Sequence, residues 1–148
     1  MAALALAGAA PGRGQALVVT EAGAGALAVV AHRGFWGPEV GVARRPGGET
    51  RVAVSVAGGD AAGVLGVRLQ ATGQMLLRPA ERSAVSPYGG LGLAFVGTAA
   101  THGAGYLTAL FGVESAPGRR AGWYAELGLG GGVRLAVGAR WRHFPAWW

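Results

Sequence analysis

The chain has 148 residues, enough for one domain, and its formal net charge is +6 because 13 basic residues, all of them arginine, outnumber seven acidic ones. Charged residues make up only 14% of the chain and apolar residues 51%, whereas a soluble domain carries about 25% charge, so much of the surface is not expected to meet water. Cysteine is absent, which excludes disulfides, thiol nucleophiles and thiolate metal sites.

Residues 1–16 are predicted to be a signal-peptide remnant or a disordered N-terminus, and residues 17–148 a single β-barrel domain. The short apolar run at 2–10 is followed by small residues, among them Gly12 and Gly14, at a spacing that fits the small-x-small rule for signal cleavage. The run is too short to cross a bilayer as a helix.

Alternation of apolar and small or polar residues with a period of two is the dominant pattern in the rest of the chain, and it indicates β-strands. It is clearest where Val52, Val54 and Val56 share one face and Arg51 and Ser55 the other. Eight alternating segments are predicted as strands, at 27–32, 36–45, 50–57, 65–72, 90–95, 106–114, 123–129 and 133–141.

The separators between these segments are rich in Gly and Pro, as turns are. Tight turns are predicted at 45–49, 58–60 and 116–119, and longer loops at 79–87 and 97–105. Strands joined directly, without room for crossover helices, predict an all-β, up-and-down antiparallel barrel of about eight strands.

The apolar face is expected to point outward, which makes this a transmembrane barrel. The other face is mostly Gly, Ala, Ser and Thr, a poor soluble exterior that fits the narrow interior of an eight-stranded barrel. Aromatic residues concentrate near the strand ends, where interfacial belts form. The predicted belt consists of Trp36, Tyr88, Tyr106, Trp123, Tyr124 and Trp141.

The segments 87–95 (PYGGLGLAF), 123–129 (WYAELGL) and 133–141 resemble strands of the small outer-membrane barrels of the OmpA-like and OmpX-like type. The resemblance implies location in the bacterial outer membrane. It also implies recognition of the C-terminal strand by the outer-membrane barrel insertion machinery, although His143 stands where that family tends to have a second strand aromatic.

Several charged residues fall on the face expected to line the lumen. A lone charge is costly in a narrow, dry interior, so opposite charges are expected to pair. We interpret them as a structural network that fills the lumen, with a gated polar pathway for ions or a small solute as the alternative. The set consists of Glu39, Arg51, Arg68, Glu114, Glu126, Arg134 and Arg140.

Further arginines gather near one rim of the predicted meander, which is periplasmic if the first strand enters from the periplasm. They are expected to contact lipid head groups of the bilayer, the alternative being ordinary solvated turn charge. This basic rim consists of Arg44, Arg45, Arg78, Arg82, Arg119, Arg120 and Arg142.

The pattern predicts no enzyme, because His32, His102 and His143 show no close Ser on the same strand face. No metal site, cofactor or nucleic-acid partner is expected. The predicted function is that of a monomeric outer-membrane barrel with a structural, membrane-integrity role and a plugged lumen. Two alternatives remain open: a soluble lipocalin-like barrel that binds an apolar ligand inside, and a lipid-modifying outer-membrane enzyme.

Overall fold

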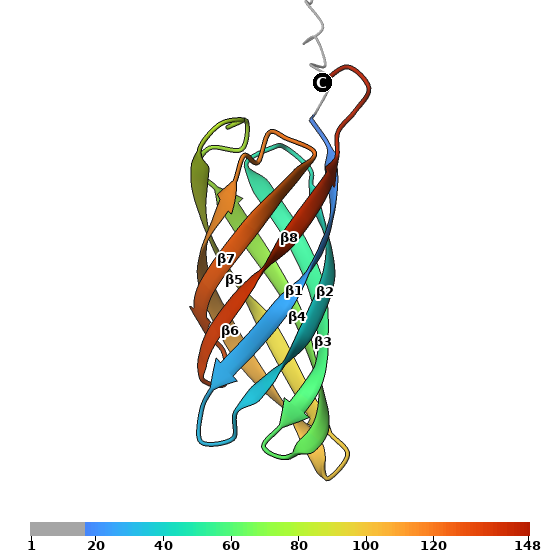
Figure 1. Cartoon of the computed structure of the whole chain (residues 1–148), viewed down its shortest axis with the longest axis vertical. Helices are drawn as coiled ribbons and strands as arrows, with labels where there is room; N and C mark the ends of the chain where they lie inside the picture. Colours follow the sequence, from blue (N-terminus) through green and yellow to red (C-terminus); the bar gives the residue numbers. More distant parts are fainter. Residues whose placement is uncertain (1–16) are drawn as a thin grey trace, which may run out of the picture.

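The computed structural model describes residues 17–148 as a closed barrel in which every strand is antiparallel to both neighbours (Figure 1). Strand β1 pairs with β8, so the sheet has no free edge. The prediction of eight strands in an up-and-down barrel is confirmed. The strands are β1 (Val19–Val30), β2 (Phe35–Arg45), β3 (Thr50–Ala61), β4 (Val64–Leu76), β5 (Val85–Thr98), β6 (Thr101–Ser115), β7 (Ala121–Leu129) and β8 (Val133–His143).

The predicted signal remnant at 1–16 lies outside the described residues. Within residues 17–148, no helix is long and apolar enough to cross a membrane.

The two ends of the barrel differ in their connections. The terminal end holds the start of the described chain at residue 17, the C-terminus and the connections 46–49, 77–84 and 116–120, whereas the distal end holds the connections 31–34, 62–63, 99–100 and 130–132 (Figure 1).

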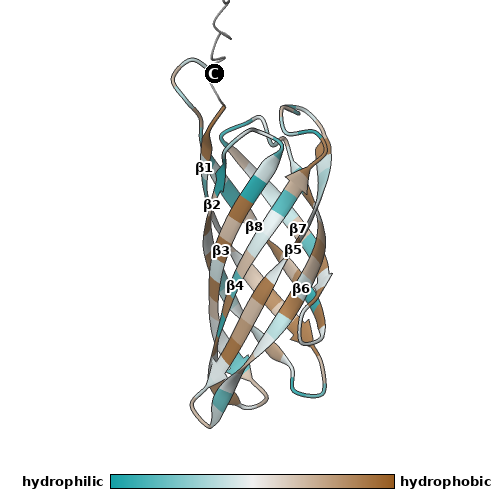
Figure 2. Ribbon diagram, turned by 180° about the vertical axis from the view of Figure 1, so that it is seen from behind, coloured by the Kyte–Doolittle hydropathy of each residue, from teal (hydrophilic) through white to brown (hydrophobic). Residues whose placement is uncertain are grey.

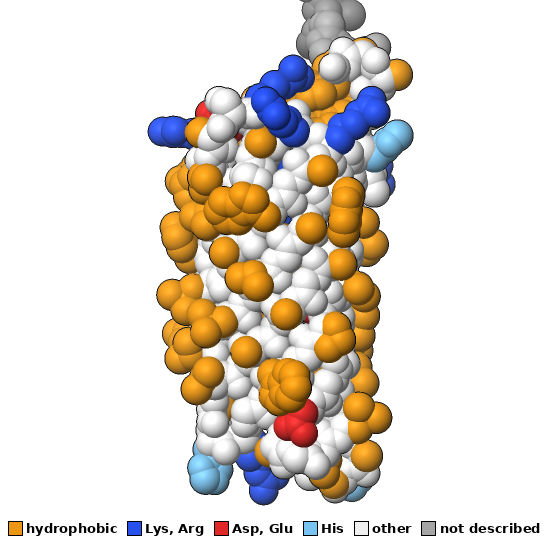
Figure 3. Space-filling model, viewed as in Figure 1, with side chains coloured by type: hydrophobic (Ala, Val, Ile, Leu, Met, Phe, Trp, Pro, Cys, Tyr) orange, Lys and Arg blue, Asp and Glu red, His pale blue; other side chains and the backbone are white. Residues whose placement is uncertain are grey.

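Apolar side chains point outward along the barrel wall, as the alternation predicted. Val52, Val54 and Val56 are 40–57% exposed, while Arg51 between the turn and Val52 is fully buried. Figure 2 shows the two kinds of residue alternating along the strands, and Figure 3 shows hydrophobic side chains over the height of the barrel. This direction argues against the lipocalin-like alternative, which requires the same side chains to line the interior.

Two predicted connections are wrong. The expected loop at 97–105 is strand, because β5 and β6 continue to Thr98 and Thr101, whose hydroxyls are 2.8 Å apart across a two-residue turn. A register irregularity between Val96 and Thr98 and the glycines in this stretch conceal the alternation. The turn expected at 58–60 lies instead at 62–63, where Ala62 and Gly63 both have positive φ, as a two-residue hairpin turn requires.

Strand β1 begins earlier than the predicted start at 27. Residues 22–26 of this strand are all Gly or Ala, which carry too little side chain to show a period of two. Pairing with β2 and β8 nevertheless begins at Val19 and Thr20. This extension brings Glu21 into the wall of the barrel.

Candidate functional site: a charged lumen

The lumen of the barrel is filled by charged side chains near its middle. All seven residues predicted for the lumen are buried there, because each occupies the inward-facing parity of its strand. Three further charged residues join them: Glu21, Arg45 and Arg142. Together, six arginines face four glutamates in the described part of the chain, so the interior holds two more positive than negative charges.

Glu114 of β6 is the centre of the part of the network nearer the terminal end. Its carboxylate accepts hydrogen bonds from Arg51 Nη2 at 2.7 Å, Arg140 Nη1 at 2.5 Å and Arg142 Nη2 at 2.9 Å. The three donors come from β3 and β8, on two sides of β6 across the lumen. Charge-assisted bonds of this kind are about twice as strong as neutral ones.

Glu21 of β1 is the second carboxylate of this region. Arg45 Nε donates to its Oε1 at 2.6 Å, and Arg51 Nε lies 2.7 Å from its Oε2. Arg142 Nε lies 3.4 Å from Oε1. Arg45 also donates to the backbone oxygen of Pro117, which fixes the β6–β7 connection to the inside of the barrel.

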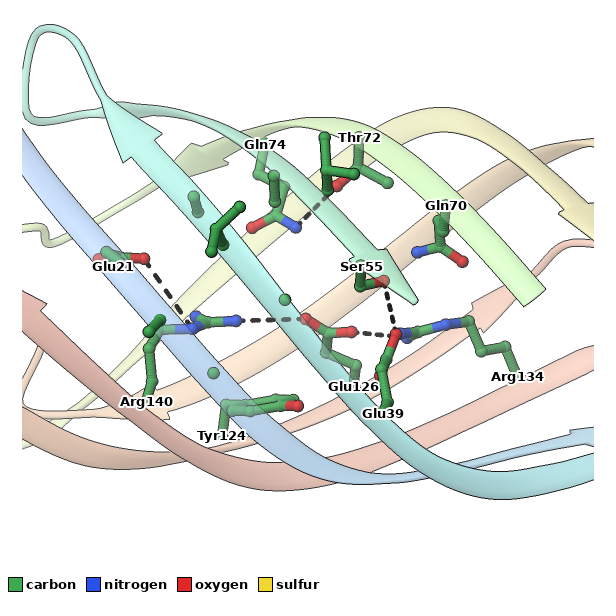
Figure 4. Close-up of a pocket in the computed structure, with 17 residues that line it drawn as sticks. Glu21, Glu39, Ser55, Gln70, Thr72, Gln74, Tyr124, Glu126, Arg134 and Arg140 are labelled. Carbon is green, nitrogen blue, oxygen red and sulfur yellow. Dashed lines mark hydrogen bonds and ion pairs between the residues drawn. The ribbon is translucent and has the colours of Figure 1, made fainter. Parts of the chain in front are cut away.

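Glu39 and Glu126 form the part nearer the distal end. Arg134 Nη1 donates to Glu126 at 2.5 Å and Nη2 to Glu39 at 3.3 Å, while the Ser55 hydroxyl donates to Glu39 at 2.6 Å (Figure 4). The Tyr88 hydroxyl donates to Glu126 at 2.6 Å. Each glutamate therefore has an arginine and a hydroxyl as partners.

Arg140 joins the two parts. Besides its bond to Glu114, its Nη2 lies 3.6 Å from Glu126, and Figure 4 shows its guanidinium between Glu21 and Glu126. The guanidinium also lies over the rings of Tyr124 and Tyr88, 4.6 and 5.4 Å from their centroids. Cation–π contacts in a desolvated position add to the ion pairs. The lumen thus contains one continuous network.

The free space beside this network is small. The cavity bounded by the side chains in Figure 4 has a volume of about 50 Å³, which admits a few water molecules. Within residues 17–148, no three His, Asp or Glu side chains come together as metal ligands do. The arrangement can hold strands together and block the lumen.

The predicted aromatic belt needs correction. Tyr88 and Tyr124 are buried inside the barrel, where the hydroxyl of Tyr88 and both rings contact the charged network. They lie near strand ends, but on the inward parity, and position along the strand alone does not distinguish the two faces. Tyr106 shares the inward register of Thr108 and lies against Gly131 at the distal mouth. Trp36, Trp123 and Trp141 are exposed on the outer face.

The predicted basic rim is also partly wrong. Arg45 and Arg142 point into the lumen, where Glu21 and Glu114 attract them. The remaining five are exposed near the terminal end, where Figure 3 shows basic side chains gathered. We call these five the exposed rim: Arg44, Arg78, Arg82, Arg119 and Arg120. Arg82 lies over the ring of Trp148, 5.3 Å from its centroid.

The histidines remain apart from the network. His32 and His102 are exposed at the distal end and His143 at the terminal end, so the structure does not bring the three together. Glu21 is the charged residue that the sequence analysis missed altogether. Counting back in steps of two from an inward Leu27 would have placed it in the lumen.

No model of a known protein family matches the chain, and no curated protein matches it. Solved structures do. The outer membrane protein OprG of Pseudomonas aeruginosa is 11% identical, with a TM-score of 0.67, over 88% of this chain and 97% of that one. The N-terminal β-barrel domain of OprF from the same organism is 14% identical, with a TM-score of 0.64, over 85% and 97%. Neisserial surface protein A is 18% identical, with a TM-score of 0.54, over 84% and 96%. These likenesses confirm the expected fold: the chain folds as the small eight-stranded outer-membrane barrels do.

Proposed function

We propose that the chain is an integral barrel of the bacterial outer membrane with a structural, membrane-integrity role, and that ion pairs keep its lumen closed. The observation that carries the proposal is the continuous Arg–Glu network across the lumen, with Arg140 linking its two parts.

The outer surface supports membrane insertion. Large apolar side chains are exposed on every strand from β2 to β8, among them Leu91, Leu107 and Leu135. A soluble protein rarely exposes so much contiguous apolar surface. The strands have 9–15 residues, and about 9–11 tilted residues cross a bilayer. The exterior therefore fits lipid tails.

The orientation and partners follow from the two ends. With the start of β1 and the C-terminus on the periplasmic side, the exposed rim faces the inner leaflet, where its arginines would contact anionic head groups. The strand that closes the barrel, β8, carries Trp141 and is the segment the insertion machinery would read. The closed sheet offers no edge for pairing with a second copy, which favours a monomer.

Conductance of planar bilayers tests lumen closure. The full chain, inserted from detergent, is expected to give no stable ohmic steps, because a cavity of about 50 Å³ admits no hydrated solute. The double variant Arg140→Ala with Tyr124→Ala removes the side chains at the junction of the network and is expected to give steps. The matched control is Trp141→Ala with Trp123→Ala on the outer face of the same strands. Conductance steps of uniform size from the unmodified chain would show that the lumen is open and would refute the proposal that it is closed.

Membrane insertion and the integrity role need separate tests. Migration in gel electrophoresis is expected to change on heating, as a closed barrel in detergent unfolds, and folding is expected to require bilayers or detergent. Loss of the gene in the source bacterium is expected to raise uptake of bulky antibiotics, with restoration by the unmodified gene. A stable monomer in plain buffer would contradict the membrane assignment, and unchanged uptake would contradict the integrity role.

A further inference from the structure

Arg68 is the charged lumen residue that the network leaves without a carboxylate. It is 2% exposed on β4, and within residues 17–148 no carboxylate forms an ion pair with it. The nearby Glu39 is engaged by Arg134 and Ser55. Both hydrogen bonds that the described residues provide come from Nη2, to Gln70 Oε1 at 3.3 Å and to the backbone oxygen of Gly130 at 3.0 Å. Nε is buried with no partner.

A buried cation without a counter-charge is unfavourable, and this one lies at the wall of a pocket. The pocket is a cup of about 660 Å³ at the distal end, formed where the β5–β6 hairpin extends beyond the other strands. Pairing of β6 with β7 begins only at Ala109, so residues 101–108 stand above the β7–β8 turn. The cup therefore lies beyond the closed part of the lumen and is open at the mouth.

The lining of the cup combines positive charge with apolar surface. Arg33 and His102 lie at its rim, and no Asp or Glu of the described chain lines it. Its walls include Val29, Phe35 and Val96. Asp60, the acidic residue on the neighbouring part of β3, bonds to the turn at Gly63. The cup thus offers one buried guanidinium within apolar walls.

We propose that the cup binds a small organic carboxylate that has an apolar body, with Arg68 as the residue that recognises its charge. A guanidinium matches the planar carboxylate group, and the apolar walls cover the rest of the molecule. A multiply charged inorganic anion fits less well, because it loses more hydration than one guanidinium replaces. This site goes beyond the proposed function and does not depend on whether the lumen below it conducts.

Titration by NMR tests the proposal directly. The full chain, labelled with ¹⁵N on its arginines and glycines and inserted in phosphatidylcholine nanodiscs, is titrated with benzoate, with its neutral isostere benzamide, and with inorganic phosphate. Benzoate is expected to shift the Arg68 Nε resonance and the Gly131 amide saturably. Benzamide and phosphate are expected to bind at least about 10-fold more weakly. Equal binding of benzamide would overturn charge recognition, and equal binding of phosphate would overturn the role of the apolar walls.

Variants locate the site. Arg68→Gln is expected to weaken benzoate binding at least about 10-fold, whereas Arg78→Gln at the terminal end serves as the control and is expected to leave it unchanged. An equal effect of both variants would overturn the proposal. If Arg68→Gln does not fold, Ala104→Trp fills the cup from an exposed wall position while Arg68 stays in place. Unchanged benzoate binding by Ala104→Trp would equally overturn it.

Discussion

Glu114 shows at the level of one residue how the interior of the barrel tolerates so many arginines. Its two oxygens accept bonds from Arg51, Arg140 and Arg142 while the residue itself is fully buried. Removing its charge leaves three guanidinium groups facing one another with Glu21 as the remaining carboxylate of that region. The isosteric change to Gln keeps the volume and so isolates the charge.

Glu114→Gln is therefore expected to lower the free energy of unfolding by about 3–5 kcal/mol, the range for breaking a buried ion pair from one side. Urea unfolding in phospholipid vesicles measures the effect. Glu49→Gln, at an exposed position in the β2–β3 connection, is the control and is expected to change the free energy by less than about 0.5 kcal/mol. If Glu114→Gln changed the free energy of unfolding as little as Glu49→Gln does, the ion pairs of Glu114 would contribute little to stability.

Glu81 is a charged residue outside the barrel wall, in the β4–β5 connection. Its carboxylate accepts hydrogen bonds from the backbone N–H of Ser83, the Ser83 hydroxyl and the backbone N–H of Ala84. These bonds favour the ionised form and lower the pKa of Glu81 from 4.5 to about 2.

The pKa of Glu81 lies below its value in the unfolded chain, so its contribution to stability is present above about pH 4.5 and is lost as the pH falls toward 2. A ¹³C NMR titration of the side-chain carboxyl is expected to show this low pKa. Ser83→Ala, which removes the hydroxyl donor, is expected to raise it. A midpoint near 4.5 in the unmodified chain would contradict the hydrogen-bonded turn.

Strands are the scale at which the sequence was most informative, and the reasons differ between strands. In β3 the alternation of Val with Arg51 and Ser55 identifies both the strand and its inward face. In β1 the run of Gly and Ala gives no period, so the strand was placed too short and Glu21 was missed. In β5 the aromatic Tyr88 lies near an end, as belt residues do, but only the register shows that it points toward Glu126.

Close approach of β4 and β5 explains why glycine occupies position 92. A Cβ there would overlap the backbone oxygen of Ala71 and come within 2.7 Å of the Thr72 Cα. Gly73, on the adjacent strand, has open space around its Cβ position. Bulk at position 92 would therefore push two paired strands apart, whereas bulk at position 73 would extend into the surroundings of the barrel.

Gly92→Ala is expected to destabilise the barrel by about 1–3 kcal/mol, as overpacking does. Gly73→Ala, the matched control, is expected to be neutral or to stabilise by up to about 1 kcal/mol through reduced freedom of the unfolded chain. Unfolding in vesicles distinguishes the two. Equal values for both variants would mean that the spacing of β4 and β5 adjusts freely.

The whole molecule presents an apolar band whose depth in the bilayer can be tested. Val56 lies near the middle of β3 on the outer face. The substitution Val56→Arg is expected to lower the free energy of unfolding by about 2–4 kcal/mol, the range for arginine at the bilayer midplane. Leu77→Arg, exposed at the terminal end, is expected to cost about 0–1 kcal/mol. Unfolding free energies in vesicles provide the comparison, and a larger cost at Leu77 would place the band elsewhere.

The overall architecture was predictable, because period-two alternation and turn chemistry are local and repeat along the chain. The partners of each charge were not, since Arg51 and Glu114 are 63 positions apart and meet only across the closed lumen. Arg45 and Arg142 were predicted to lie at the rim because the sequence shows that they are close to turns. It does not show that their side chains point inward, because the carboxylates that attract them come from other strands.

Pairing of β1 with β8 has a consequence for the way the molecule folds. Glu21 enters with the first strand and Arg140 and Arg142 with the last, so the ion pairs between them, which add to those that each makes with other strands, form only when the two ends of the chain meet. Without this closure the barrel would have an open hydrogen-bonding edge, and Arg140 and Arg142 would lack Glu21 as a second carboxylate partner. Pairing of β1 with β8 therefore closes the open edge and forms these ion pairs in the same step. This favours all-or-none assembly and disfavours stable half-formed intermediates.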